Sequence, residues 1–313
     1  MQVTPEENAA YGKFVIDLAV ELGIFDLRGI ETVWHYTDGK GFLGILQSGR
    51  LHATQVSALN DSKETRYATD LFREEVMRAI AEQSGNDSAV AFFQSILEQV
   101  EEAPDNPTQG ISKFYVACFS AKGDDLNQWS KYTKASPGRF AIAFHPSGLY
   151  REPNSALYRV IYDRAKLEAA VKKVVYATHD FYMRGLFGER AEKPEEWAKL
   201  FYLAWDEWIY KLAPVVKDQQ WDSEVELRIV HELKLADFPD VRFTQKKYSL
   251  ARYLPLDFPC WVKERVSRLP IAKVMVGPGE NQASSRVSAI LLLEQMGYLN
   301  VPVEISRCNF VER

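Results

Sequence analysis

Strand-like segments of this chain are separated by helical stretches of very unequal length, and this irregular order restricts the fold more than any other feature. The apolar runs Phe114 to Ser120 and Arg139 to Phe144 predict two strands of a buried sheet. Helical periodicity covers about residues 63–83, 88–101 and 163–213. A regular parallel sheet needs strands and helices that alternate evenly, so this spacing favours an α+β fold.

The remaining segments complete the order of elements. A capping-box pair, Thr4 and Glu7, predicts the start of a first helix, and Gly23 is placed to end it. Further helices are expected at residues 41–47, 126–132 and 284–296, and further strands at residues 31–37, 51–53, 158–162, 224–230, 273–276 and 301–305. We therefore expect an N-terminal helical extension over residues 1–28 and a single α+β domain over residues 29–313, with a helical insertion at about 163–213.

Composition indicates an ordinary globular protein. Hydrophobic residues make up 46% and charged residues 26%, a balance that excludes disorder on a large scale. The formal charge of −5 argues against non-specific binding to nucleic acid, which needs a strongly basic surface. A local basic patch stays open, because Arg252, Lys263, Arg265 and Arg268 are close in sequence, although a solvated face explains them more simply.

The chain shows no sign of export, of a disulfide framework or of a metal site. Its start, MQVTPEENAA, lacks the basic and apolar blocks of a signal peptide, and its longest apolar stretches are too short to cross a bilayer. Cys118, Cys260 and Cys308 are scattered and never at CxxC spacing, and the lone His179-Asp180 pair is weak support for a metal. We expect a cytoplasmic protein that needs no metal.

Two acids and an arginine alternate in the segment Glu224-Val225-Glu226-Leu227-Arg228. On a strand over 224–230, the apolar residues would point into the core, and Glu224, Glu226 and Arg228 would share the other face. Two interpretations remain open. The face is solvated, or it lines a cleft in which the arginine lowers the cost of keeping two carboxylates ionised together.

Two further segments carry polar and aromatic residues at the ends of predicted strands. The first is His35-Tyr36-Thr37, where the histidine could also serve only as a strand-end cap. The second runs from Ser120 into a short helix that carries Gln128, Trp129 and Tyr132. Asn60 lies in a loop before a helix, next to Asp61, whose simplest role is as that helix's N-cap.

Taken together and in this order, these motifs resemble a known bacterial family. The order is HYT with a GxxxIL helix and SGxL, then LND, then CFS…D…QW..Y with a G..AIAF strand, then E-x-E-x-R, VGPGENQ and VPVEISRC. It is similar to the bacterial domain-of-unknown-function family numbered twenty-nine seventy-one, from about residue 32 to the end. By its opening pattern, that family in turn resembles the ADP-ribosyltransferase superfamily, including DNA-modifying toxins and tRNA 2′-phosphotransferases.

The resemblance implies a split, mainly antiparallel sheet of ADP-ribosyltransferase-like type and a site that binds and cleaves NAD without a metal. Carried over residue by residue, His35 takes the first position, Ser120 or Tyr132 the second, Glu226 the catalytic third and Glu224 its partner acid. The expected NAD-binding residues are His35, Tyr36, Thr37, Asn60, Ser120, Gln128, Trp129, Tyr132 and Arg228. We expect His35, Ser120 and Glu226 to converge on one cleft.

The function implied by the resemblance is NAD-dependent mono-ADP-ribosylation inside a bacterial cell, with a toxin or an antiviral effector as the suggested roles. An NAD glycohydrolase would use the same site with water as acceptor. A third alternative is a non-catalytic sensor or interaction protein that keeps the fold without the reaction. The acceptor stays open among a protein, a nucleic acid and a small molecule, and the charge does not indicate nucleic acid.

Overall fold

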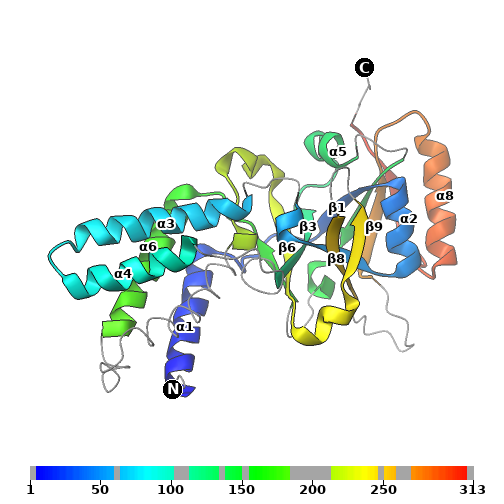
Figure 1. The fold of residues 1–313 in the computed structure, drawn as a ribbon. Coiled ribbons are helices and arrows are strands. Elements are labelled where there is room, and N and C mark those ends of the chain that lie inside the picture. The colour runs from blue at the N-terminus through cyan, green and yellow to red at the C-terminus, as the bar shows by residue number, and fades with distance from the viewer. Residues whose placement is uncertain are drawn as a thin grey trace. The chain divides into compact units, whose positions relative to one another are not determined.

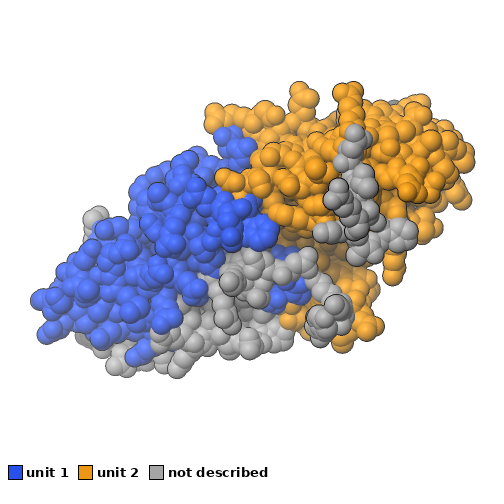
Figure 2. Space-filling model, turned by 90° about the horizontal axis from the view of Figure 1, so that it is seen from above, with its two compact units in different colours: residues 1–26, 56–114, 159–221 blue, residues 27–55, 115–158, 222–313 orange. Residues whose placement is uncertain are grey.

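The computed structural model describes residues 5–59, 64–101, 113–133, 138–149, 155–183, 213–245, 250–258 and 269–308. The chain forms two compact units, coloured separately in Figure 2. The helical unit contains residues 1–26, 56–114 and 159–221, and the sheet unit contains residues 27–55, 115–158 and 222–313. Each unit is therefore built from three separate segments of the chain. The domain boundaries expected from the sequence stay a prediction.

A ten-stranded, unclosed sheet is the main feature of the sheet unit (Figure 1). Its central order is β10-β9-β4-β1-β3-β2-β8-β7, with β6 pairing β3 and β5 off this path. β10 runs parallel to β9, whereas the registered pairs β1–β4, β4–β9, β2–β8 and β7–β8 are antiparallel. The strands are β1 Val33–Asp38, β2 Leu51–Gln55, β3 Phe114–Ser120, β4 Arg139–Phe144, β5 Ser155–Arg159, β6 Glu226–Glu232, β7 Arg242–Gln245, β8 Leu250–Leu256, β9 Ile271–Val276 and β10 Val303–Ile305. The fold is α+β with a mixed, mostly antiparallel sheet.

β3 is the strand on which the sheet divides, because it pairs with β1, β2 and β6. β1 is paired with β4 along its whole length, from Val33 to Asp38. It is registered against β3 only at Trp34 opposite Ser120. β1 and β3 therefore meet at the end of β3, where the chain leaves the sheet toward α5 (Leu126–Tyr132).

Alternate residues of the strands supply two apolar clusters. The larger includes Val33, Phe119 and Leu227, and the helices α2 (Gly39–Ser48) and α8 (Gln282–Gln295) add Phe42, Leu46, Ala289 and Leu293 to it. The smaller joins Trp34 and Tyr36 of β1 to Trp129 of α5. Since neighbours along a strand point to opposite faces, β1 separates the two clusters. α5 is thereby fixed beside the end of β3.

Four helices make up most of the described part of the helical unit: α1 Pro5–Leu22, α3 Glu64–Glu82, α4 Asp87–Glu101 and α6 Arg164–Met183. α3 packs against both α4 and α6, and the three lie side by side in Figure 1. The 3-10 turn Ala213–Val215 packs on α3 and leads to a short parallel bridge between Ile161 and Val216. No described helix is both long enough and apolar enough to span a membrane.

The structure confirms the predicted β3, β4 and α5 to the residue. It corrects the strand expected at 158–162, since β5 lies at Ser155–Arg159, and it adds β7 and β8, which the sequence did not indicate. Of the helical pattern over 163–213, α6 covers Arg164–Met183. Residues 184–212 lie outside the described part of the chain.

Candidate functional site

The two acids of the Glu-x-Glu-x-Arg segment lie on different elements. Glu224 ends the 3-10 helix η6 Gln219–Glu224, and β6 begins only at Glu226. Between them Val225 adopts a left-handed backbone with φ of 44°, an uncommon conformation for a β-branched residue. This turn breaks the alternation, so the expectation that Glu224 shares a strand face with Glu226 and Arg228 is wrong. Val225 is also only half-buried, instead of pointing into the core.

Glu226 and Arg228 form a buried ion pair on β6. The guanidinium donates from Nε to Oε1 of Glu226 at 2.8 Å and from Nη2 to Oε2 at 3.0 Å. Only 2% of the Arg228 side chain and 6% of the Glu226 side chain are exposed. The interpretation of this face as solvated is therefore wrong. Leu227 and Ile229 point into the larger apolar cluster, as expected.

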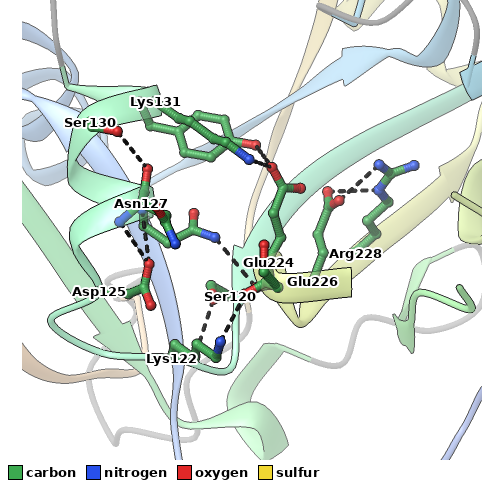
Figure 3. A network of polar contacts seen from close by, with 12 residues as sticks. Ser120, Lys122, Asp125, Asn127, Ser130, Lys131, Glu224, Glu226 and Arg228 are labelled. Atoms are coloured by element: carbon green, nitrogen blue, oxygen red, sulfur yellow. Dashed lines mark hydrogen bonds and ion pairs between the residues drawn. The ribbon is translucent and has the colours of Figure 1, made fainter. Parts of the chain in front are cut away.

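Glu224 is the centre of a network that reaches the surface through α5 (Figure 3). Its Oε1 accepts from Lys131 Nζ at 2.9 Å and from the Tyr132 hydroxyl at 3.5 Å. Glu224 itself is 3% exposed, whereas Tyr132 is 41% exposed and the Lys131 side chain is 35% exposed. A buried carboxylate thus touches two side chains that extend to solvent.

The backbone of the same residue is also bound. The Glu224 carbonyl oxygen accepts from Ser120 Oγ at 2.7 Å and from Gln128 Nε2 at 3.4 Å. Nearby, Lys122 Nζ donates to the Ser223 carbonyl at 2.9 Å. The end of β3 and the start of α5 therefore hold the turn before β6 at several points (Figure 3).

α5 presents three residues of the network because of its periodicity. Asp125 caps the helix by accepting from the amides of Asn127 and Gln128 at 2.9 and 3.1 Å. Gln128, Lys131 and Tyr132 stand at i, i+3 and i+4, so they share one face of the helix. Lys131 was not among the expected site residues, although this spacing could have indicated it.

Tyr36 and Trp129 are brought together as core residues. Their rings meet edge to face with centroids 4.7 Å apart, and they are 7% and 1% exposed. The Tyr36 hydroxyl donates to the Lys122 carbonyl and accepts from the Asp125 amide at 3.1 Å, and burial raises the pKa of this phenol. These contacts account for both rings by packing. A stacking role on a nicotinamide is not required to explain them.

His35 lies on the other face of the strands from Ser120. Trp34 is paired with Ser120, so alternation places His35 with Phe119, and their ring centroids are 5.8 Å apart. Its Nδ1 is 2.9 Å from the Cys118 carbonyl oxygen, which can only accept, so Nδ1 carries the proton. Burial is the main reason why the pKa of His35 lies below its ordinary value. Its ring is directed toward Phe119, whereas the Ser120 hydroxyl is directed toward Glu224.

The last two expected residues lie apart from the network. Thr37 Oγ1 lies against the backbone of Gly41, at the start of α2, where a side chain at Gly41 would have no room. Asn60 lies outside the described residues. The structure thus brings together Ser120, Gln128, Tyr132 and Glu224, with Lys131 added and the Glu226–Arg228 pair on the adjoining strand.

In comparisons with known proteins, no family model, no curated protein and no solved structure matches the chain. The resemblance drawn from motif order stays an expectation. Within the described ranges, no group of three or more His, Cys, Asp or Glu side chains is placed to hold a metal ion. What the network offers chemically is a buried carboxylate beside an ammonium, a phenol, a hydroxyl and an amide.

Proposed function

We propose that the sheet unit binds NAD and transfers its ADP-ribose to an acceptor, with Glu224 as the catalytic carboxylate. The observation that carries the proposal is the contact of the buried Glu224 Oε1 with Lys131 and Tyr132, two side chains that reach solvent. A ligand can displace these partners by rotation of exposed side chains. The mostly antiparallel, unclosed sheet is compatible with an ADP-ribosyltransferase-like fold.

The reaction requires a negative charge close to the ribose. When the bond between C1′ and the nicotinamide nitrogen breaks, its electron pair leaves with the nicotinamide and the ribose becomes cationic. A nearby carboxylate stabilises that cation, as in glycoside hydrolysis. The acceptor then bonds to C1′ and gives up a proton. The Lys131 ammonium can exchange the carboxylate for the diphosphate of NAD, because its stem is flexible.

In this proposal Glu224 takes the catalytic role that the resemblance gave to Glu226. Both oxygens of Glu226 are engaged by Arg228, and that pair is almost fully buried. We assign it to holding the start of β6 in place. His35 takes no part in binding, since its ring lies beside Phe119.

The experiment is product analysis with NAD labelled in its adenosine half, on the parent, Glu224→Gln and a control. Glu232→Gln is a matched control, because Glu232 is the last residue of β6, the strand that follows Glu224, and it pairs with Lys234 at 3.0 Å. We expect nicotinamide release by the parent and the control. A loss of about a hundredfold is expected for Glu224→Gln, the scale known for removing one electrostatic stabiliser.

The position of the label then separates the alternatives. Label attached to an acceptor supports a transferase, and free ADP-ribose supports an NAD glycohydrolase on the same residues. Binding of NAD without turnover supports a sensor. If the parent neither binds nor cleaves NAD, or if Glu224→Gln turns over NAD as fast as the parent, the proposal is wrong.

A further inference from the structure

The loop between β3 and α5, residues 121–125, is hydrogen-bonded to the segment Ser306–Cys308, which follows β10. At its centre Asp124 has a left-handed backbone with φ of 54°, which aspartate tolerates better than most residues. Its Oδ1 accepts from the Ser306 hydroxyl, and its Oδ2 accepts from the Arg307 amide at 2.8 Å. The Cys308 thiol donates to the Asp124 carbonyl oxygen at 3.2 Å. One residue therefore binds three consecutive residues of the segment Ser306–Cys308.

The same carboxylate also binds α5. Trp129 Nε1 donates to Asp124 Oδ1 at 2.9 Å, so a single oxygen joins the helix to Ser306. Burial alone would raise the pKa of Asp124, but the bonds from Ser306, Arg307 and Trp129 lower it below its ordinary value. The group is thus an ionised acceptor at neutral pH, and hydrogen bonds to an ionised acceptor are the stronger kind.

The segment Ser306–Cys308 is itself anchored to the sheet. The Ser306 amide donates to the Val276 carbonyl at 2.8 Å at the end of β9, and Ser306 Oγ accepts from the Cys308 amide at 3.0 Å. Ser306 is 7% exposed, and Gln282 Nε2 donates to its carbonyl at 3.4 Å. The segment can therefore transmit the position of β9 and α8 to Asp124.

β1 holds the opposite side of the loop. The Tyr36 hydroxyl bridges the Lys122 carbonyl and the Asp125 amide, the latter at 3.1 Å. Gly123 lies so close to the Trp34 indole that a Cβ would be 2.5 Å from its Cε2. The loop is thus enclosed between β1 and Ser306–Cys308, and α5 starts directly after it.

We propose that Asp124 is a positioning residue, through which the segment Ser306–Cys308 holds α5 so that Lys131 and Tyr132 meet Glu224. The structural part of this inference is independent of the reaction, and only its effect on turnover rests on the proposed function. Loss of the link loosens α5, because Trp129 is bonded at both ends of the helix: its amide donates to the Asp125 carbonyl at 3.0 Å, and its carbonyl accepts from the Thr133 amide at 3.3 Å.

The test is hydrogen exchange of the α5 amides in Asp124→Asn and Ser306→Ala. Asparagine also tolerates the left-handed backbone, so Asp124→Asn removes the charge and replaces one carboxylate oxygen by an NH₂ group without adding backbone strain. We expect exchange of the α5 amides to become about tenfold faster in both variants, the effect of losing one strong hydrogen bond. Ser306→Thr keeps the hydroxyl and should restore slow exchange. The Cys308 thiol, followed by mass spectrometry after alkylation, should react faster in Asp124→Asn.

Asp38→Ala is the matched control, because alanine removes the helix cap. Asp38 caps α2 in the same unit by accepting from the Gly41 amide at 2.6 Å, without touching α5. It should speed exchange in α2 and leave α5 unchanged. The inference is overturned if Asp124→Asn and Ser306→Ala leave α5 exchange at the parental rate, or if they speed α2 and α5 equally. A parent that lacks NAD turnover but shows the exchange pattern would contradict the proposed function and leave the positioning role supported.

Discussion

Arg228 and Glu226, two positions apart on β6, meet through two hydrogen bonds of 2.8 and 3.0 Å in an almost fully buried pair. Residues i and i+2 of a strand share a face, which explains how such close neighbours in sequence can pair. Leu227 and Ile229 fill the larger apolar cluster, and the pair lies on the opposite face of β6. Because so little of either side chain reaches water, each charge is stabilised by its partner and solvent cannot take the partner's place.

Breaking the pair from one side should therefore cost far more than removing it altogether. Glu226→Leu and Arg228→Met each leave a buried group without its counter-charge, and we expect each to lower the free energy of unfolding by about 3–5 kcal/mol. The double variant Glu226→Leu/Arg228→Met should lose less than the sum of the single changes. Denaturant unfolding of the four proteins measures the cycle. Additive single effects would show that the two side chains do not act as a pair.

Gly123→Ala should destabilise the sheet unit. The added Cβ would stand 2.5 to 2.8 Å from three atoms of the Trp34 indole, which must then move. A loss of about 1–3 kcal/mol is typical of such overpacking. Gly44→Ala is a control of opposite sign, because Gly44 lies inside α2 with nothing within 4 Å of the new Cβ. We expect it to gain about 0.5–1 kcal/mol from helix propensity. Thermal unfolding of both variants decides the matter, and an equal effect of the two changes would contradict the close contact.

His35 should make the protein less stable in mild acid. Burial lowers the pKa of His35 in the folded protein, so the unfolded chain binds this proton at a higher pH. The contribution is fully present above pH about 6.5 and is lost as the pH falls below it. His35→Gln should reduce the slope of stability against pH in that range, by up to about 1.4 kcal/mol per pH unit. Urea midpoints from pH 5 to 7, chosen to span about the ordinary histidine pKa, provide the measurement. Parallel curves for the two proteins would exclude this role.

Glu75 of α3 should weaken the helical unit at neutral pH. Its side chain is 4% exposed, and within the described residues its Oε1 has no hydrogen-bond partner, although Oε2 pairs with Arg78. Burial raises the pKa of Glu75, so the folded protein holds this proton more tightly than the unfolded chain. Stability is therefore lost as the pH rises through the ordinary range of glutamate titration.

Glu75→Met keeps the length of the side chain and removes the charge. At pH 7 we expect it to stabilise the protein by about 1 kcal/mol, with a smaller gain near pH 4. Glu74→Met is a suitable comparison, because Glu74 is an exposed neighbour on the same helix with 60% of its side chain accessible. A destabilising Glu75→Met would show that the pair with Arg78 outweighs the burial of the charge.

The strands with continuous apolar runs could be predicted from the sequence because a strand that is buried on both faces needs apolar residues at nearly every position. β3 and β4 are almost entirely buried, and both were predicted to the residue. β7 was missed because all four of its residues are exposed, so no apolar face marks it. β6 was predicted two residues early. The alternation of Glu224 with Glu226 and Arg228 continues in the sequence, but the left-handed turn at Val225 interrupts it in space.

The candidate site was predicted in part for the same reason. Ser120, Gln128 and Tyr132 surround Glu224 because they lie at the end of one well-marked strand and on one face of the next helix. The expected approach of His35 depended on which face of β1 it occupies, and sequence alone does not fix that. Only the pairing of Trp34 with Ser120 decides it.

The division of the sheet unit among three segments also governs how a growing chain can reach this fold. Arg50 and Asp257 form an ion pair across 207 positions, beside the contact of β2 with β8. The outer partner of β4 is β9, which ends at Val276. While the chain is still on the ribosome, β2 and β4 each keep one unpaired backbone edge, because the segment 159–221 of the helical unit is made before β8 and β9. Such long-range closure is slow, so newly made molecules are open to unwanted strand pairing until the last third of the protein arrives.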